Sequence, residues 1–358
     1  MDERSGNRPA VPTPRRVLVT RLRRIGDAIL VLPVIEALHE RFPSCSIDFL
    51  AESAPAQAAA NHPAIDRVLV VDRTLGSLLP ASPRLLWGLR RRGYDWVIDL
   101  YGNPRSALLA AWTGAPVRVG PARRARRRLY THVVQPVSEP ISAIAHHLRS
   151  LEALGMTPAP ALRPPRITLT EREREQGRAR LESALPAGAP RVGIHAGNRW
   201  PAKRWPEERF TGLVRALPRI GARALVLAGP GEEALARRIA AGGGAGLDAP
   251  VIGGLPLRDY WSVIAALDAL VTVDGSPIHA GPALQVPTVG ILGPTEPEIW
   301  FPYQASDGHQ LLSREIWCRP CHRHECARMD CLDWISVGDA LQAVARALAH
   351  AGGARAIA

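Results

Sequence analysis

Short runs of aliphatic and β-branched residues alternate with longer, helix-like segments along the first half of the chain. Apolar runs of this length, bounded by helical segments, are typical of buried parallel strands. We expect strands at 16–22, 46–52, 67–73 and 96–102. The apolar positions recur with a helical period at 27–42, 54–62, 82–93 and 104–114.

The proline-rich stretch TPAPALRPPR at 157–166 interrupts this alternation and predicts a linker. The alternation then restarts, with strands expected at 191–197, 222–229, 250–254, 269–275 and 287–293. Two such series predict an α/β protein of two Rossmann-like, doubly wound domains facing across a cleft. We place a disordered lead-in at 1–15, an N-terminal domain at 16–165 and a C-terminal domain at 166–358.

Composition and charge narrow the class of protein. The 358 residues are 46% hydrophobic and contain no apolar run of about 18 residues, so we expect a globular protein that stays in the cytoplasm. The formal net charge is +12, and RRARRR at 123–128 concentrates arginine. Such charge suits nucleic acid, an anionic membrane or a phosphorylated substrate, although a solvated loop is an equal alternative. No nucleic-acid-binding motif accompanies it, which argues against a DNA-binding protein.

The ends of the predicted strands carry the candidate chemistry, because ligands bind outside the carboxyl ends of parallel strands. Asp27 follows the first strand and opens a helix whose dipole stabilises a carboxylate. It is our candidate general base, with a purely structural first-turn acid as the alternative.

Two further strand ends lie in the C-terminal domain. Lys203, the only lysine of the chain, follows the first of its strands together with Asn198. This lysine is either compositional drift or a compact cation placed against a phosphate. Glu232 follows the glycine turn AGPG, where a carboxylate suits a ribose hydroxyl. GxGxxG and Walker A sequences are absent, which makes a dehydrogenase or a P-loop ATPase unlikely.

The segment VDGSPIHAGPAL carries a third strand-end loop. A strand ends at Asp274, Gly275 and Ser276 form a turn, and a helix begins near Pro277. Backbone N–H groups at a helix start suit a diphosphate, and His279 would lie one turn further on. An ordinary serine N-cap explains the same residues without a ligand.

Three segments resemble glycosyltransferase family 9, the heptosyltransferases of the lipopolysaccharide core: RVLVTRLRRIGDAILVLP, VGIHAGNRWPAKRWPEERF and VTVDGSPIHAGPALQVPTVGILGPTEP. The resemblance implies a GT-B fold, an ADP-sugar donor, usually ADP-heptose, and inverting transfer that needs no cofactor. It implies Asp27 as general base, Lys203 as the catalytic cation on donor phosphate and Glu232 on the ribose. Asn198, Asp274, Gly275, Ser276 and His279 would complete the donor site.

The predicted acceptor is an anionic glycolipid, contacted by Arg123, Arg124, Arg126, Arg127 and Arg128 during peripheral binding to the inner membrane. Other GT-B activities, including a different sugar or acceptor or an epimerase, stay open. A nucleic-acid-binding protein with a metal knuckle is the alternative from another class.

The Cys-rich loop at 318–331 holds four of the five cysteines, namely Cys318, Cys321, Cys326 and Cys331. Disulfides are not expected in a cytosolic chain, and four close thiols suit a structural zinc or iron. His322 and His324 are competing ligands. Cys45 we expect to be a buried small residue.

Overall fold

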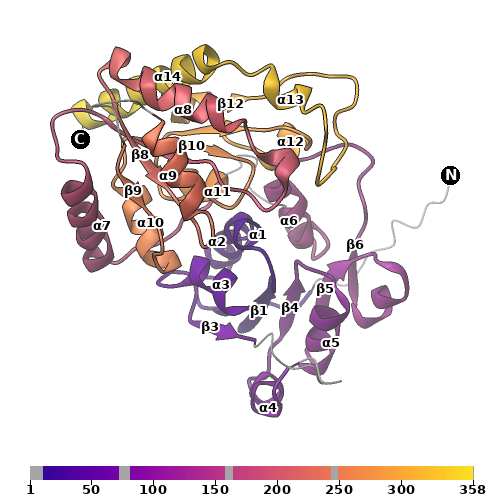
Figure 1. The fold of residues 1–358 in the computed structure, drawn as a ribbon. Coiled ribbons are helices and arrows are strands. Elements are labelled where there is room, and N and C mark those ends of the chain that lie inside the picture. Colours follow the sequence, from indigo (N-terminus) through magenta and orange to yellow (C-terminus); the bar gives the residue numbers. More distant parts are fainter. Residues whose placement is uncertain (1–10, 72–80, 158–163, 243–248, 358) are drawn as a thin grey trace. The chain divides into compact units, whose positions relative to one another are not determined.

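The computed structural model describes residues 11–71, 81–157, 164–242 and 249–357. The chain divides into two compact units (Figure 1). Unit 1 comprises residues 1–139 and 144–163, and unit 2 comprises residues 140–143 and 164–358. Predicted features at 1–10, 72–80, 158–163 and 243–248, including most of the lead-in and the linker, lie outside the described residues.

Unit 1 is built on a parallel sheet of six described strands in the order β3-β2-β1-β4-β5-β6. Their bounds are β1 Arg16–Thr20, β2 Ser46–Ala51, β3 Arg67–Val70, β4 Trp96–Asp99, β5 Val117–Pro121 and β6 His132–Val134. The first four confirm the predicted strands. β5 and β6 were not predicted, since β5 alternates with arginine and ends in Gly-Pro, and β6 has three residues.

The helices of unit 1 flank this sheet: α1 Ile25–Leu30, α2 Leu32–Arg41, α3 Ser53–Ala56, α4 Pro83–Arg91, α5 Pro104–Trp112 and α6 Ala143–Glu152. Two 3₁₀ turns, η1 Gln57–Ala59 and η2 Arg124–Leu129, complete it. The single helix predicted at 27–42 is wrong, because the chain divides into α1 and α2 at Val31. Pro33 has no N–H to continue the hydrogen-bond ladder there. The helix predicted at 54–62 is also shorter and consists of α3 and η1.

Unit 2 repeats the plan with a parallel sheet of six described strands in the order β12-β11-β10-β7-β8-β9. Their bounds are β7 Arg191–His195, β8 Arg223–Leu227, β9 Val251–Ile252, β10 Ala269–Val273, β11 Thr288–Ile291 and β12 Gln310–Leu312. The short edge strand β12 was not predicted. Each sheet has the classical dinucleotide-fold order, which confirms the predicted doubly wound α/β class.

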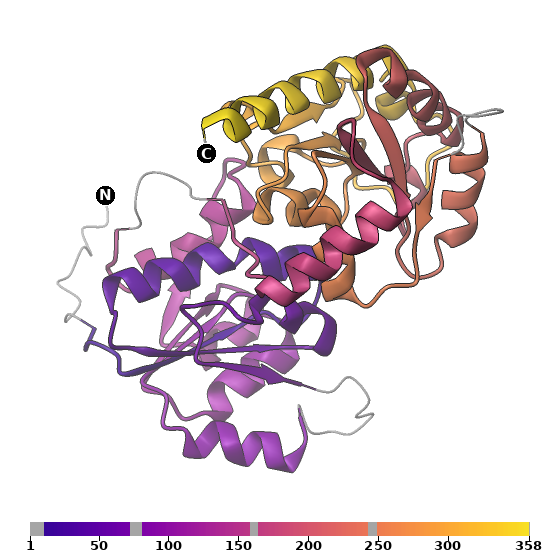
Figure 2. The ribbon, with the colours of Figure 1, turned by 90° about the vertical axis from the view of Figure 1, so that its left-hand side faces the viewer.

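The helices of unit 2 are α7 Glu171–Ala184, α8 Glu207–Ala216, α9 Glu233–Ala241, α10 Leu257–Ala265, α11 Pro277–Ala283, α12 Pro297–Trp300, α13 Asp330–Asp333 and α14 Val337–Ile357. Three 3₁₀ turns lie between them: η3 Pro201–Lys203, η4 Leu217–Ile220 and η5 Ala305–Asp307. The long α14 packs along β10, β11 and β12 (yellow in Figure 2).

The core of unit 2 ties the loop after β7 to the rest of the unit. Trp205 is 2% exposed and packs edge-on against Phe210 of α8. Its indole Nε1 donates a hydrogen bond to the carbonyl of Ile335 at 3.1 Å. The segment that carries Lys203 is therefore anchored two residues further on by a large buried ring. Within the part of the chain that is described, no helix is both long and apolar enough to traverse a bilayer.

Candidate active site

Each sheet has one switch point, where successive crossovers leave in opposite directions and a crevice opens at the strand ends. In unit 1 it lies between β1 and β4, and in unit 2 between β7 and β10. Asp27 follows β1, whereas the loops with Lys203 and Asp274 follow β7 and β10. Strand order alone therefore brings Lys203 and Asp274 to one crevice.

An ion pair joins these two residues. The Lys203 Nζ lies 2.5 Å from Asp274 Oδ2, and their side chains are only 13% and 6% exposed. Thr295, after β11, donates its hydroxyl to the same Asp274 oxygen at 2.5 Å. Asn198 donates its side-chain amide to the Asp274 carbonyl at 2.5 Å. The lone lysine thus belongs to a nearly buried polar network.

Trp200 and His324 hold the lysine loop from the other side. The Lys203 Nζ lies 4.5 Å from the centroid of the Trp200 ring, within cation–π range. The His324 ring stacks on Trp200 with centroids 3.8 Å apart, and its carbonyl accepts the Ala202 N–H at 3.0 Å. The Cys-rich loop therefore supports the lysine loop. Our sequence reasoning missed Trp200 and Thr295, and it considered His324 only as a competing metal ligand. The paired Trp-Pro steps around Lys203 were a signal for Trp200.

Glu232 lies in the loop after β8, where Gly229 and His195 hold its carboxylate. Its Oε2 accepts the Gly229 N–H at 2.9 Å and lies 3.4 Å from His195 Nε2. Tyr260 places its hydroxyl 2.9 Å from the other nitrogen of His195. Burial lowers the pKa of His195, although the nearby Glu232 carboxylate opposes that shift. The imidazole is therefore neutral near pH 7 and bridges Tyr260 to Glu232.

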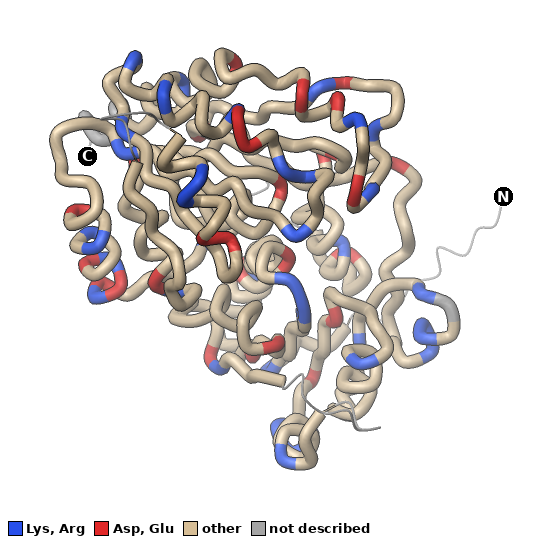
Figure 3. Tube along the Cα trace, viewed as in Figure 1, with Lys and Arg blue, Asp and Glu red and all other residues tan. Residues whose placement is uncertain are grey.

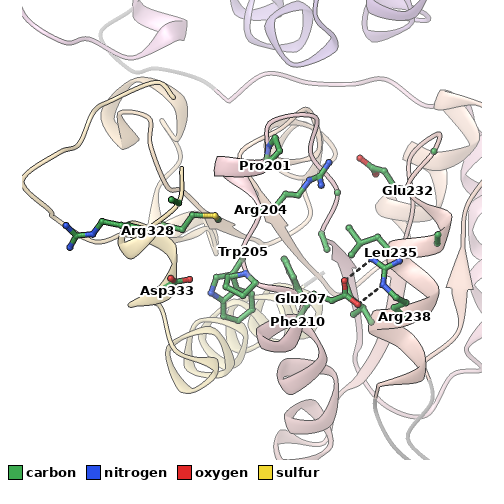
Figure 4. A pocket seen from close by; sticks show the side chains of 18 residues that line it. Pro201, Arg204, Trp205, Glu207, Phe210, Glu232, Leu235, Arg238, Arg328 and Asp333 are labelled. Atoms are coloured by element: carbon green, nitrogen blue, oxygen red, sulfur yellow. Dashed lines mark hydrogen bonds and ion pairs between the residues drawn. The ribbon is translucent and has the colours of Figure 1, made fainter. Parts of the chain in front are cut away.

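Gly197 is required beside this carboxylate. A Cβ at that position would lie 2.0 Å from Glu232 Cδ, so any larger residue would displace Glu232. Figure 4 shows Glu232 at one side of a pocket of about 560 Å³, with Arg204 nearer its middle. Glu207 and Arg238 also line the pocket and are joined by two hydrogen bonds of 2.9 Å.

The turn after β10 leaves little room beside Gly275. A Cβ on Gly275 would lie 3.3 Å from the amide nitrogen of Asn198. Ser276 is the N-cap of α11 but makes no side-chain capping bond there. His279 is 4% exposed, and its Nδ1 lies 3.0 Å from the Tyr303 hydroxyl. The structure thus brings Asn198 and Gly275 together, whereas His279 is packed against Tyr303.

Asp27 lies in the first turn of α1 and pairs with Arg21. Arg21 Nη2 is 2.7 Å from Asp27 Oδ2, with side chains 13% and 16% exposed. The same guanidinium donates to the Leu100 carbonyl at 2.6 Å and lies 4.9 Å from the centroid of the Tyr101 ring. Arg24, directly before α1, has φ +70°, a strained value for a non-glycine residue. Arg21, directly after β1, thus fixes the carboxylate and is itself held by residues after β4.

Further arginines surround this crevice. Arg23 lies 3.0 Å and Arg105 3.6 Å from the same Oε1 of Glu52. Sequence reasoning missed Arg21, Arg23, Arg105 and Glu52, because their proximity depends on strand order.

The arginine run forms η2 after β5, and β5 is two strand positions from β1, about 10 Å across the sheet. Arg123, Arg127 and Arg128 are exposed and Arg126 is half-buried. The side chain of Arg124 lies outside the described set. The run therefore follows the strand that lies two positions from β1, the strand that precedes Asp27.

All five cysteines are free. Burial, followed by the neighbouring thiols of Cys321, Cys318 and Cys326, raises the pKa of Cys331 to about 11. Cys45 is buried as expected, at 8% exposure. Across the described residues, no three His, Cys, Asp or Glu side chains are grouped as a metal ion requires, so the predicted structural metal stays a prediction.

Paired doubly wound units with charged loops at their switch points are the framework of a GT-B glycosyltransferase. Residues 83–331 match the model of glycosyltransferase family 9 (heptosyltransferase). The chain belongs to this family and is a glycosyltransferase.

Individual proteins that are similar to this chain support the same family assignment. Lipopolysaccharide heptosyltransferase 1 of Pseudomonas aeruginosa is 30% identical over 325 residues, which cover 87% of each chain. A glycosyl transferase family 9 structure from Veillonella parvula has a TM-score of 0.80 at 24% identity, covering 94% of this chain and 97% of that one. The structure of ADP-heptose LPS heptosyltransferase II from Escherichia coli has a TM-score of 0.77 at 21% identity, covering 93% and 98%. These structures confirm the predicted GT-B fold.

Proposed function

We propose that this protein is an inverting transferase that moves a heptose or a related sugar from an ADP-sugar to an acceptor of the lipopolysaccharide-core type. The names of the relatives from P. aeruginosa and E. coli support the sugar and the acceptor. The observation that carries the donor site is the nearly buried pair of Lys203 and Asp274 at the switch point of unit 2.

The donor would lie along the loops after β7, β8 and β10. The Lys203 ammonium would neutralise charge on the leaving diphosphate, with Asp274 and Trp200 fixing its position. Gly275 and Ser276 would let the phosphates approach the backbone, while Asn198 holds that turn. Glu232, fixed by His195, would accept hydrogen bonds from the ribose hydroxyls. His279, packed on Tyr303, would support the same turn from α11.

Asp27 would serve as the general base. Its carboxylate takes the proton of the acceptor hydroxyl as the oxygen attacks the anomeric carbon, and the bond from that carbon to the diphosphate breaks. The negative charge then passes to ADP, where Lys203 stabilises it. The reaction so written inverts the anomeric centre and requires no cofactor.

The acceptor would be an anionic glycolipid. Arg23 and Arg105, beside Glu52, lie in the same crevice of unit 1 as Asp27 and suit acidic groups on the sugar. The arginine run would contact the lipid surface during peripheral binding to the cytoplasmic face of the inner membrane. Exposed charge attraction is screened over about 8 Å at physiological salt, so that contact should weaken as salt rises.

Binding of ADP tests the donor site. At a hundred times its Kd, ADP should stabilise the wild-type protein by about 2.7 kcal/mol. Lys203→Met should lose most of this stabilisation, whereas Arg215→Met, an exposed cation on α8, should keep it. If duplex DNA stabilises the protein at moderate salt and ADP does not, the nucleic-acid alternative replaces the proposal.

Turnover tests the base. Asp27→Asn should lower kcat by at least about a hundredfold while leaving the affinity for ADP unchanged. The matched control is Asp307→Asn, which changes an exposed carboxylate in η5. Full activity of Asp27→Asn would remove the base assignment and leave the donor site intact.

Metal analysis tests the Cys-rich loop. A structural zinc or iron there would appear as about one equivalent of metal in purified protein, lost on replacing Cys321 and Cys326 by serine. Metal-free protein of full activity would discard the prediction.

A further inference from the structure

Helices α4 and α5 of unit 1 present tryptophan and leucine to solvent. Trp87 of α4 is 60% exposed, and Leu108 and Trp112 of α5 are each 49% exposed. Leu108 and Trp112 are four residues apart and therefore share one face of α5. The Trp112 indole donates to the Leu86 carbonyl at 2.9 Å, so it joins α5 to α4. We call these three exposed side chains, which lie on two helices joined by that bond, the apolar strip.

Arginines border this strip on both sides. Arg84 and Arg91 lie one turn before and after Trp87, and the Arg91 guanidinium lies 4.4 Å from the Trp87 ring centroid. On the far side, α5 packs against η2, where Arg127 and Arg128 are exposed. Figure 3 shows blue segments on α4 and on the η2 loop.

Acidic side chains are nearly absent from this stretch of sequence. Residues 83–138 contain eleven arginines and two acidic residues, Asp95 and Asp99. Asp99 is 1% exposed and bonded to Tyr130 and Thr20. Asp95 accepts hydrogen bonds from the backbone N–H groups of Arg15 and Arg16. Asp95, just before β4, and Asp99, at its end, are both engaged in the sheet, whereas α4, α5 and η2 contain arginines and no carboxylate.

We infer that the strip of Trp87, Leu108 and Trp112, with its flanking arginines, is the surface by which this protein docks on an anionic lipid bilayer. Amphipathic indole rings lie at the headgroup level of membranes, and arginines beside them pair with lipid phosphates. This combination fits a bilayer better than a protein partner, because nothing on the strip demands a shaped counterpart and the charge around it has one sign. The inference deepens the proposed function, since it names the surface through which a membrane-bound acceptor is reached.

Co-sedimentation with vesicles tests the surface without any sugar transfer. The wild-type protein should bind vesicles of phosphatidylglycerol and phosphatidylethanolamine, and bind phosphatidylcholine vesicles much more weakly. Arg84→Gln with Arg91→Gln should weaken binding about 25-fold, since each arginine contributes about fivefold at an anionic surface. Trp87→Ser with Leu108→Ser should weaken it at least about tenfold through lost apolar burial.

Matched changes in unit 2 provide the controls. Trp317 and Leu311 are 86% and 38% exposed, so Trp317→Ser with Leu311→Ser removes a similar pair of exposed apolar side chains. Arg215→Gln with Arg219→Gln removes two exposed arginines from α8 and η4. These controls should bind vesicles as the wild type does. Equal losses in the controls, or no binding of wild type to anionic vesicles, would overturn the inference.

Two further measurements separate the remaining outcomes. If light scattering shows a dimer that dissociates in Trp87→Ser with Leu108→Ser, the strip is an interface between copies and the inference is wrong. With a water-soluble acceptor, the variants of the strip should transfer sugar at the wild-type rate. A wild-type protein that transfers sugar but does not bind anionic vesicles refutes only the docking surface, whereas one that binds vesicles but transfers no sugar refutes only the proposed function.

Discussion

Removing the charge of Lys203 should destabilise unit 2 as well as the donor site. The ammonium lies 2.5 Å from Asp274, and both side chains are nearly buried. Lys203→Met keeps most of the side-chain volume, including the contact with Trp200, but leaves the Asp274 carboxylate without its cation. Of the partners described above, only the Thr295 hydroxyl would still donate a hydrogen bond to Asp274 Oδ2.

The magnitude follows from two opposing terms. At 2.5 Å, an effective dielectric constant of 20 gives a gross attraction of about 7 kcal/mol. Desolvation of both groups offsets most of it, while loss of one partner of a buried pair costs about 3–5 kcal/mol. The Thr295 bond offsets part of that cost, so Lys203→Met should lower the free energy of unfolding by about 3 kcal/mol. The double variant, Lys203→Met with Asp274→Asn, should recover about 2 kcal/mol of that loss, because no buried charge then remains.

Urea unfolding of the four proteins in this double-mutant cycle measures the coupling free energy between Lys203 and Asp274. The control cycle uses Arg178 and Glu171, an ion pair whose side chains are 57% and 66% exposed. Exposed pairs contribute little, so the control should show no measurable coupling. Equal coupling in the two cycles, or additivity at Lys203 and Asp274, would refute the reasoning that burial makes this pair strong.

Three further predictions concern unit 2. His195→Gln should raise the KM for the ADP-sugar more than it lowers kcat, because His195 positions Glu232; steady-state kinetics measures this, and an unchanged KM would contradict it. The Arg258 hydrogen bonds lower the pKa of Glu173 to about 2, so its stabilisation is complete above about pH 4.5 and is lost as pH falls toward 2. Glu173→Gln should therefore lower the free energy of unfolding by up to about 3 kcal/mol at pH 7. Urea unfolding at several pH values should show a smaller loss of stability below about pH 4.5 in the variant than in the wild type, and an equal loss would refute this. Trp205→Ala should cost about 3–5 kcal/mol in the same assay, because Trp205 is 2% exposed, and a cost under about 1 kcal/mol would contradict its anchoring role.

Much of the fold could be predicted because its cause is local. The buried strands β1, β4, β7 and β10 are continuous apolar runs, and such runs are unmistakable in a doubly wound sheet. The edge strands β6 and β12 have three residues each, too few for any periodicity. The break at Val31 depends on Pro33 within a segment whose apolar period continues through it.

The candidate site was predictable only where one strand end supplies the residue. Asp27, Lys203 and Asp274 follow that rule. Their partners do not, because Arg21 reaches Leu100 across β1 and β4, and His324 reaches Trp200 from a loop far along the chain. Contacts of this kind depend on strand order and loop packing, which no spacing in the sequence encodes.

Formation of a glycosylated product tests the central claim most directly. Wild-type protein would be incubated with ADP-heptose and a core lipid that lacks heptose, and the lipid analysed by mass spectrometry. Our account predicts addition of one heptose by the wild type, and almost none by Asp27→Asn or Lys203→Met of verified fold. No transfer by a wild-type protein that binds ADP would contradict the sugar or the acceptor. Undiminished transfer by both variants would contradict the site.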